Sequence, residues 1–150
     1  MRIVIQRVKK ASVTIEKTVK SAIGPGLLIL VGMEDSDTQE DALWLAQKTV
    51  GMRIFSDSYG KMNLDLVQAD GELLVVSQFT LHAQTKKGNR PSFIRAARPD
   101  KAIPLYEYFV EQLQLLAKKP VQTGTFGAMM DIELINDGPV TIWMDSASKE

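Results

Sequence analysis

The sequence predicts a single α+β domain in which two main helices pack against a mostly antiparallel sheet or a barrel-like β core. Three observations predict this fold class. Short apolar segments have the pattern of strands, two longer segments have the apolar spacing of amphipathic helices, and they alternate as strands, helix, strands, helix, strands. With 150 residues, 45% of them hydrophobic, residues 1–150 are ordinary for one domain with its own core.

The N-terminal segment is expected to form β-strands. Near-alternate apolar residues from Ile3 to Ile15 predict a strand, and Glu16-Lys17 is suited to a hairpin connection. Gly24-Pro25-Gly26 then interrupts the pattern. The continuous apolar run from Leu27 to Val31 has the length of a strand buried on both faces, so we expect it in the middle of the sheet.

A helix is expected next, from Asp37 to about Val50. Asp37 and Glu40 stand three residues apart, as the two partners of a capping box do. Leu43, Ala46 and Val50 recur at helical spacing, so these side chains are expected to face the core.

The rest of the chain repeats this alternation. Residues 52–55 and 62–66 flank a turn-rich stretch and predict a second hairpin, while residues 73–81 give the strongest signal of a buried strand. Residues 84–91 predict an exposed loop. A second helix over residues 99–118 and closing strands over residues 121–126, 129–135 and 140–144 complete the expected order.

Composition limits the classes of function. Lys plus Arg equals Asp plus Glu at 18 each, so no overall positive field attracts polyanions, and a nucleic-acid contact requires a local patch. The absence of cysteine excludes disulfides and thiolate catalysis and is compatible with a reducing cytoplasm. The longest apolar run is far shorter than the roughly 20 residues of a membrane-spanning helix, so we expect a soluble protein.

Polar residues interrupt the buried strand at Ser77-Gln78-Phe79-Thr80. If the strand stays regular, Gln78, Thr80 and His82 share one face, where an amide, a hydroxyl and an imidazole would position a carbonyl group or a water. The alternative is a strand end whose side chains only satisfy backbone groups.

His82 is the only histidine in the chain and therefore the only side chain whose unperturbed pKa lies near neutrality. A nucleophile and base pair of Thr80 with His82 is conceivable. No carboxylate lies close in sequence to orient the ring, so a lone surface histidine is the simpler interpretation. The same isolation argues against a metal site.

Basic residues concentrate in the segment from Lys86 to Lys101, which holds six of the eighteen Lys and Arg residues against one acid, Asp100. In a neutral protein such a cluster is a candidate for phosphate binding, with Phe93 available to stack on a base. The alternative is a solvated loop that keeps the protein in solution.

Asn136-Asp137-Gly138-Pro139-Val140-Thr141 has the composition of a turn between two strands. A simple hairpin connection is one interpretation. The other is a cis peptide at Gly138-Pro139, which would hold two neighbouring carbonyl groups in one direction as a rigid polar finger.

Three of these segments resemble the signatures of the D-aminoacyl-tRNA deacylase family. They are Ser77 to Thr80, Gly88 to Phe93 and Asn136 to Thr141, in this order. Gln6-Arg7-Val8 and the segment from Leu105 to Phe109 are also similar to that family, so the resemblance covers essentially the whole chain.

The resemblance implies a cytoplasmic homodimer that hydrolyses the ester bond of D-aminoacyl-tRNA, with no cofactor and no metal. Its partners would be the aminoacylated 3′ end of tRNA and a second copy of the chain, with no DNA or membrane partner. Glycine mischarged on tRNA would be a further substrate. The Gly138-Pro139 carbonyls of each subunit would complete the other subunit's pocket, grip the substrate α-ammonium group and exclude L side chains.

The resemblance also assigns residues to these tasks. The catalytic segment would be Ser77, Gln78, Phe79 and Thr80. The substrate would contact Arg7, Phe93, Phe126, Gly127, Ala128, Met129, Gly138 and Pro139. The tRNA would contact Lys86, Lys87 and Arg90.

The role of Thr80 stays open between a nucleophile and a residue that positions the ester while the substrate's ribose 2′-hydroxyl assists water. We favour positioning, because no adjacent base activates Thr80. Two other functions compete with the deacylase: an esterase or amidase for small molecules that uses Thr80 with His82, and a noncatalytic RNA-binding module that uses the basic segment.

Overall fold

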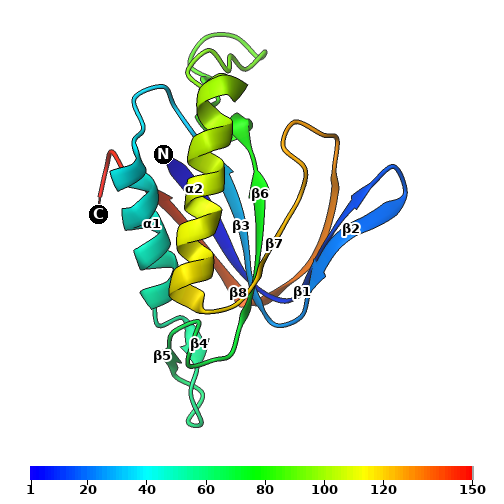
Figure 1. Cartoon of the computed structure of the whole chain (residues 1–150), viewed down its shortest axis with the longest axis vertical. Coiled ribbons are helices and arrows are strands. Elements are labelled where there is room, and N and C mark those ends of the chain that lie inside the picture. Colours follow the sequence, from blue (N-terminus) through cyan, green and yellow to red (C-terminus); the bar gives the residue numbers. More distant parts are fainter. Residues whose placement is uncertain (150) are drawn as a thin grey trace.

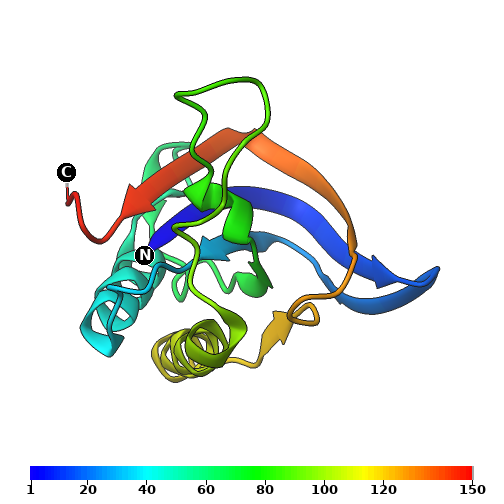
Figure 2. The ribbon, with the colours of Figure 1, turned by 90° about the horizontal axis from the view of Figure 1, so that it is seen from above.

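Two helices cover one face of a strongly curved mixed sheet in the computed structural model, which describes residues 1–149 (Figures 1 and 2). The helices are α1 (Gln39–Gly51) and α2 (Pro99–Ala117), and a short 3-10 helix, η1, spans Phe79–His82. The strands are β1 (Arg2–Ile15), β2 (Thr18–Ile23), β3 (Gly26–Gly32), β4 (Phe55–Ser56), β5 (Met62–Leu64), β6 (Glu72–Ser77), β7 (Val121–Thr123) and β8 (Asp131–Asp145). The predicted α+β class, with a β core that nearly closes into a barrel, is confirmed.

Strand β1 organises the sheet, because β2, β3 and β8 all pair with it in antiparallel register. The other two pairings, β3 with β6 and β6 with β7, are parallel. Parallel neighbours require a crossover connection, and the segments that contain α1 and α2 supply the two crossovers. Both helices therefore lie on the same side of the sheet, with the main core between them and β1, β3 and β6.

The start of α1 differs from the expectation by one residue. The N-cap is Thr38, and its capping-box partner is Asp41 rather than Glu40. Asp37 instead accepts a hydrogen bond from the Glu34 N–H at 2.7 Å. On the inward face of the helix Ala46 and Val50 are buried as predicted, whereas Leu43 is only partly buried and Leu45 is fully buried.

Strand β8 corrects a second expectation, since the predicted turn over residues 136–141 is a bulge within one strand of 15 residues. Gln6 faces Thr141 and Val8 faces Asn136, so the four residues 137–140 project from the ladder opposite Arg7. Pairing with β1 continues on both sides of the bulge. In the described part of the chain, no helix is long and apolar enough to cross a membrane.

We predict that Gly26→Ala destabilises the fold by about 3 kcal/mol. Parallel pairing brings Glu72 so close that a Cβ atom at position 26 would lie 2.0 Å from the Glu72 carbonyl oxygen. Gly51→Ala is the matched control, because a Cβ atom there meets nothing within 4 Å at the end of α1. Urea unfolding of both variants measures the difference, and equal midpoints would contradict the steric explanation.

Candidate active site

A pocket of about 300 Å³ opens where the parallel strands β3 and β6 end, beside the first turn of α2. The carboxyl ends of parallel strands are a usual place for a site, because loops of different origin meet there. The sequence-predicted residues that line it come from two separate segments: Ser77, Gln78 and Phe79, and Phe126, Gly127, Ala128 and Met129. Apolar side chains dominate the remaining wall, with Met33, Met130 and Ile132 among them.

Strand β6 ends at Ser77, so the expected strand over residues 73–81 is four residues too long. The Gln78 N–H donates to the Val31 carbonyl at 2.6 Å, and the chain then turns into η1. Gly32 makes room for this turn, since a Cβ atom there would lie 2.7 Å from the Gln78 carbonyl oxygen. Regular strand alternation therefore does not apply to Gln78, Thr80 and His82.

The side chains of Thr80 and His82 are engaged with other residues. The Gln78 amide Nε2 donates to the Thr80 hydroxyl at 2.6 Å. The His82 ring is 1% exposed, and its Nδ1 lies 2.7 Å from Oε1 of Glu34. The interpretation of His82 as a surface residue is therefore wrong, and within residues 1–149 no hydrogen bond joins it to Thr80.

Glu34 connects His82 to a third residue, Arg95. The Arg95 Nη2 lies 2.8 Å from Oε1 and 2.9 Å from Oε2 of Glu34. Burial alone would raise the pKa of the Glu34 carboxyl, but hydrogen bonds and charge from Arg95 and His82 outweigh it and hold the pKa below its ordinary value. Glu34 is thus ionised at neutral pH.

Aromatic residues build part of the rim and part of the wall. The Phe79 ring meets the Phe93 ring edge to face, with centroids 5.2 Å apart, and both rings are exposed. Phe126 meets Tyr106 of α2 at 6.0 Å. Burial raises the pKa of Tyr106 to about 12, so its hydroxyl stays protonated and donates to the Val75 carbonyl at 2.9 Å.

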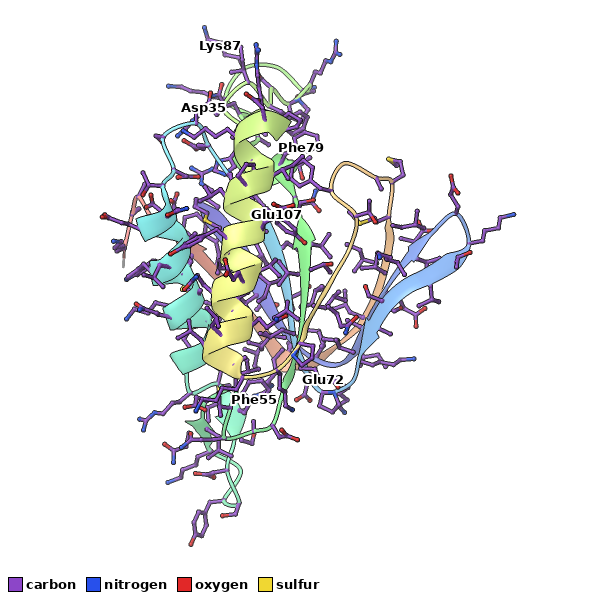
Figure 3. The ribbon with its side chains drawn as sticks, in the orientation of Figure 1. Asp35, Phe55, Glu72, Phe79, Lys87 and Glu107 are labelled. Atoms are coloured by element: carbon purple, nitrogen blue, oxygen red, sulfur yellow. The ribbon has the colours of Figure 1, made fainter. Side chains whose placement is uncertain are left out.

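The predicted tRNA-binding residues Lys86, Lys87 and Arg90 lie on an exposed loop beyond the pocket. Backbone hydrogen bonds between Gln84 and Ser92, in both directions, close the neck of this loop. Figure 3 shows Lys87 at the end of the molecule, past Phe79. We call residues 84–92 the basic loop.

The bulge in β8 contains the expected cis peptide between Gly138 and Pro139. Arg7 lies beneath it, nearly buried, with Nε 3.1 Å from Oδ2 of Asp137 and Nη1 donating to the Ile54 carbonyl at 2.5 Å. Arg7 and Asp137 form an ion pair, but the Arg7 Nε–H makes no hydrogen bond within residues 1–149. The predicted site residues that do not line the pocket of their own chain are Thr80, Arg7, Phe93, Gly138 and Pro139.

Comparison with known proteins identifies the family. Residues 4–145 match the family described as D-Tyr-tRNA(Tyr) deacylase. The chain is 63% identical to a D-aminoacyl-tRNA deacylase of Parabacteroides distasonis, over 100% of both chains. It belongs to the D-Tyr-tRNA deacylase family.

Two solved structures share the fold of this deacylase-family chain. The c-Myc DNA unwinding element binding protein is 39% identical, with a TM-score of 0.91 over 97% of this chain and 98% of that one. A probable eukaryotic D-amino acid tRNA deacylase is 17% identical, with a TM-score of 0.83 over 95% and 97%. Family membership makes the chain an ester hydrolase of the deacylase class, as its motifs predict.

Several residues of the site were missed by reasoning from the sequence. Glu34 is the main one, because 48 positions separate it from His82 in the chain. Arg2 is another, and its Nη1 donates to the Leu81 carbonyl at 3.1 Å. The one local signal for either is that Glu34 is the first charged residue after a long apolar run.

We predict that Glu34→Gln lowers stability at neutral pH by an amount that shrinks in acid. The folded pKa of Glu34 lies below its ordinary value of 4.5, so its stabilisation is complete above that value and is lost as the pH falls through the folded pKa. Urea unfolding of both proteins across this range measures the difference. Glu107→Gln, an exposed change on α2, is the control, and a pH-independent difference for Glu34→Gln would contradict the explanation.

Proposed function

We propose that this chain hydrolyses D-aminoacyl-tRNA to a free D-amino acid and tRNA and rejects the L-aminoacyl substrate. The observation that carries the proposal is the meeting of two segments on one pocket: the Ser77 to Phe79 motif and residues 126–129. A close relative over its full length bears the name D-aminoacyl-tRNA deacylase.

The chemistry requires little from side chains. An aminoacyl ester is already activated, so orientation of the ester and a water, with stabilisation of the oxyanion, supplies much of the rate. The backbone N–H groups of Phe79 and Thr80 begin η1, and neither has an acceptor within residues 1–149. These two groups are our candidates for the oxyanion contacts.

The decisive assay is ester loss from D-tyrosyl-tRNA and L-tyrosyl-tRNA incubated with the purified protein. Rapid loss of the D ester alone supports the proposal. Equal loss of both esters points to an unselective esterase, and binding of tRNA without hydrolysis points to an RNA-binding module. Either result overturns the proposal.

Thr80 acts in this mechanism as a positioning group. Its hydroxyl already accepts a hydrogen bond from the Gln78 amide, and no base within residues 1–149 contacts it. The substrate's own ribose 2′-hydroxyl then assists the attacking water.

We predict that Thr80→Ala lowers kcat by about tenfold to a hundredfold, rather than abolishing hydrolysis, and leaves the fold intact. Removing a group that only orients the ester leaves the oxyanion contacts in place. Single-turnover rates measure the loss, and Thr18→Ala, the same change at an exposed position of β2, serves as the control. Trapping of an acyl group on Thr80 would refute the positioning role.

The exposed aromatic rim suits the terminal adenosine of tRNA. Phe79 and Phe93 both present ring surface to solvent at the pocket edge, and base stacking on aromatic rings is tolerant of sequence. The basic loop lies further out, where phosphates of the acceptor stem would pass. Lys86, Lys87 and Arg90 then supply a local attraction that the neutral molecule as a whole lacks.

We predict that reversing the charges of Lys86 and Lys87 to Glu weakens tRNA binding by about tenfold or more and makes its salt dependence shallower. Each phosphate contact that is lost lowers the number of counterions released when tRNA binds, and the salt dependence falls with that number. The same reversals at Lys17 and Lys20, exposed on the β1–β2 hairpin, are the matched control for net charge. Titrations of tRNA binding at several salt concentrations measure the slope of affinity against salt. Equal slopes for both double variants would mean that the basic loop is only a solvated surface. Duplex DNA as a competitor tests the expectation that DNA is no partner.

A homodimer accounts for the exposed edge of the sheet. In the part of the chain that the structure describes, strand β8 pairs only with β1, so its other edge is open over 15 residues. Trp143 is 53% exposed and Ile135 is 46% exposed on this strand. A long open edge with exposed apolar side chains favours pairing with another chain, and two-fold symmetry brings the same strand of a second copy against it.

The Gly138-Pro139 bulge lies on this same edge strand and lines no part of its own pocket. In the proposed dimer its carbonyl groups enter the partner's pocket and bind the substrate α-ammonium group. This grip leaves space for a D side chain and makes an L side chain collide. Arg7 contributes by holding the bulge from below rather than by lining a pocket. Glycine has no side chain to collide with the pocket, so glycine mischarged on tRNA is a second substrate.

We predict that a subunit with a defective bulge and one with a defective pocket restore activity when mixed. Gly138→Val displaces the bulge, because φ is +116° and a Cβ atom would lie 2.7 Å from Arg7 Nη2. Gln78→Ala impairs the pocket. If each site combines two subunits, one site of the mixed dimer has both intact parts. Activity of the mixture no greater than the sum of the separate variants would refute completion of the site by the partner.

The reaction also indicates the compartment. The substrate arises where tRNA is charged, and a chain without cysteine loses nothing in a reducing environment. We therefore infer a cytoplasmic enzyme, and fractionation of cells that express the tagged protein tests the inference.

A further inference from the structure

Three segments that surround the proposed site converge on the Glu34 carboxylate. Glu34 follows strand β3, His82 ends the turn that begins at Gln78, and Arg95 lies between the basic loop and α2. The carboxylate Oε1 lies 2.7 Å from His82 Nδ1. Arg95 Nη2 lies 2.8 Å from the same oxygen and 2.9 Å from Oε2. A backbone hydrogen bond joins the segments of Glu34 and Arg95, because the Ala97 N–H donates to the Met33 carbonyl at 2.9 Å.

The His82 half of this arrangement is buried and directional. An ionised carboxylate only accepts hydrogen bonds, so the His82 proton resides on Nδ1 and points at Glu34. Nε2 is buried and has no partner within residues 1–149. Of the two ring nitrogens only Nδ1 is therefore hydrogen-bonded, and this bond orients the last residue of the turn that carries Thr80.

The Arg95 half lies at the surface, where its side chain is 48% exposed. Arg95 follows the closing residue of the basic loop, Ser92, by three positions. Its guanidinium contacts both carboxylate oxygens through one nitrogen, which fixes the loop's base against the segment that follows β3. The turn and the basic loop thus share one anchor.

We propose that Glu34, together with His82 and Arg95, positions the basic loop relative to the turn, so that a tRNA held by its phosphates presents its ester at the Gln78 to Thr80 turn. This inference rests on the proposed deacylase function. Glu34 and Arg95 touch no substrate in this account and act as positioning residues. The Arg95 contact matters only for substrates long enough to reach the basic loop.

Two substrates separate this role from simple destabilisation. D-tyrosyl-tRNA reaches the basic loop, whereas the D-tyrosyl ester of adenosine has no acceptor-stem phosphates. For Arg95→Ala we expect KM for D-tyrosyl-tRNA to rise about fivefold or more, with kcat/KM for the adenosine ester unchanged. Arg95→Lys restores part of the loss. Arg98→Ala removes the same charge from an exposed residue that makes no ion pair within residues 1–149, and is the control.

Glu34→Gln distinguishes positioning from electrostatics. The change removes a negative charge near the basic loop, so electrostatics alone lowers KM for D-tyrosyl-tRNA. Positioning instead raises KM, because the amide has one acceptor oxygen in place of two and turns an N–H group toward His82 or Arg95, which weakens the anchor. A lower KM in Glu34→Gln, equal loss on both substrates in Arg95→Ala, or no loss at all would overturn the proposal.

The single histidine gives a readout that does not depend on activity. Nitrogen NMR of the imidazole, which needs no assignment in this chain, should show the proton on Nδ1. Uncharged tRNA should shift the His82 signals in the wild-type protein but not in Arg95→Ala. Signals that tRNA leaves unmoved in the wild type, or moves equally in both proteins, would overturn the coupling. Failure of the deacylase function would appear separately, as a wild-type protein that does not hydrolyse D-tyrosyl-tRNA.

Discussion

The site depends on one backbone hydrogen bond, from the Gln78 N–H to the Val31 carbonyl. This bond, 2.6 Å long, ends the parallel pairing of β3 with β6 and starts the turn. It forms because Gly32 has no side chain to keep the turn away from β3. Two N–H groups at the start of η1 are thereby left without partners among residues 1–149, beside a pocket lined by Ser77 and Phe79. A regular strand would have used those groups in its ladder.

Strand pairing also determines the position of the bulge in β8, at the edge of the sheet. Regular pairing with β1 on both sides fixes where residues 137–140 leave the ladder. Asn136 stabilises the bulge, because its Oδ1 accepts the Val140 N–H at 3.1 Å and its Nδ2 donates to the Thr141 hydroxyl at 3.0 Å. Arg7 supports it from below. In both places, polar backbone becomes available where strand pairing stops, and neighbouring strands determine the position.

Most of the fold could be predicted from the sequence, because local patterns carry it: the buried run of β3, the hairpin at Glu16-Lys17 and the apolar stripe of α2. The errors arise where distant residues decide. Phe79 and Leu81 extend the apolar pattern past Ser77 and conceal the end of β6, since the Val31 carbonyl that ends it belongs to another strand. Asn-Asp-Gly-Pro suits a bulge as well as a turn, and only pairing with β1 selects the bulge. The partner of His82 is 48 positions away.

The engagement of the polar side chains limits the chemistry that the site can perform. Thr80 is held by Gln78 and His82 by Glu34, so within the described residues neither forms a nucleophile and base pair. A site of this kind is unsuited to an amide bond but suited to an aminoacyl ester, which is activated and has its own neighbouring hydroxyl. Catalysis then depends on how accurately the ester is placed, because misplacement by about 1 Å costs about a hundredfold in rate. In the proposed mechanism Glu34 and Arg7 touch no substrate and act on the rate through the segments that they hold.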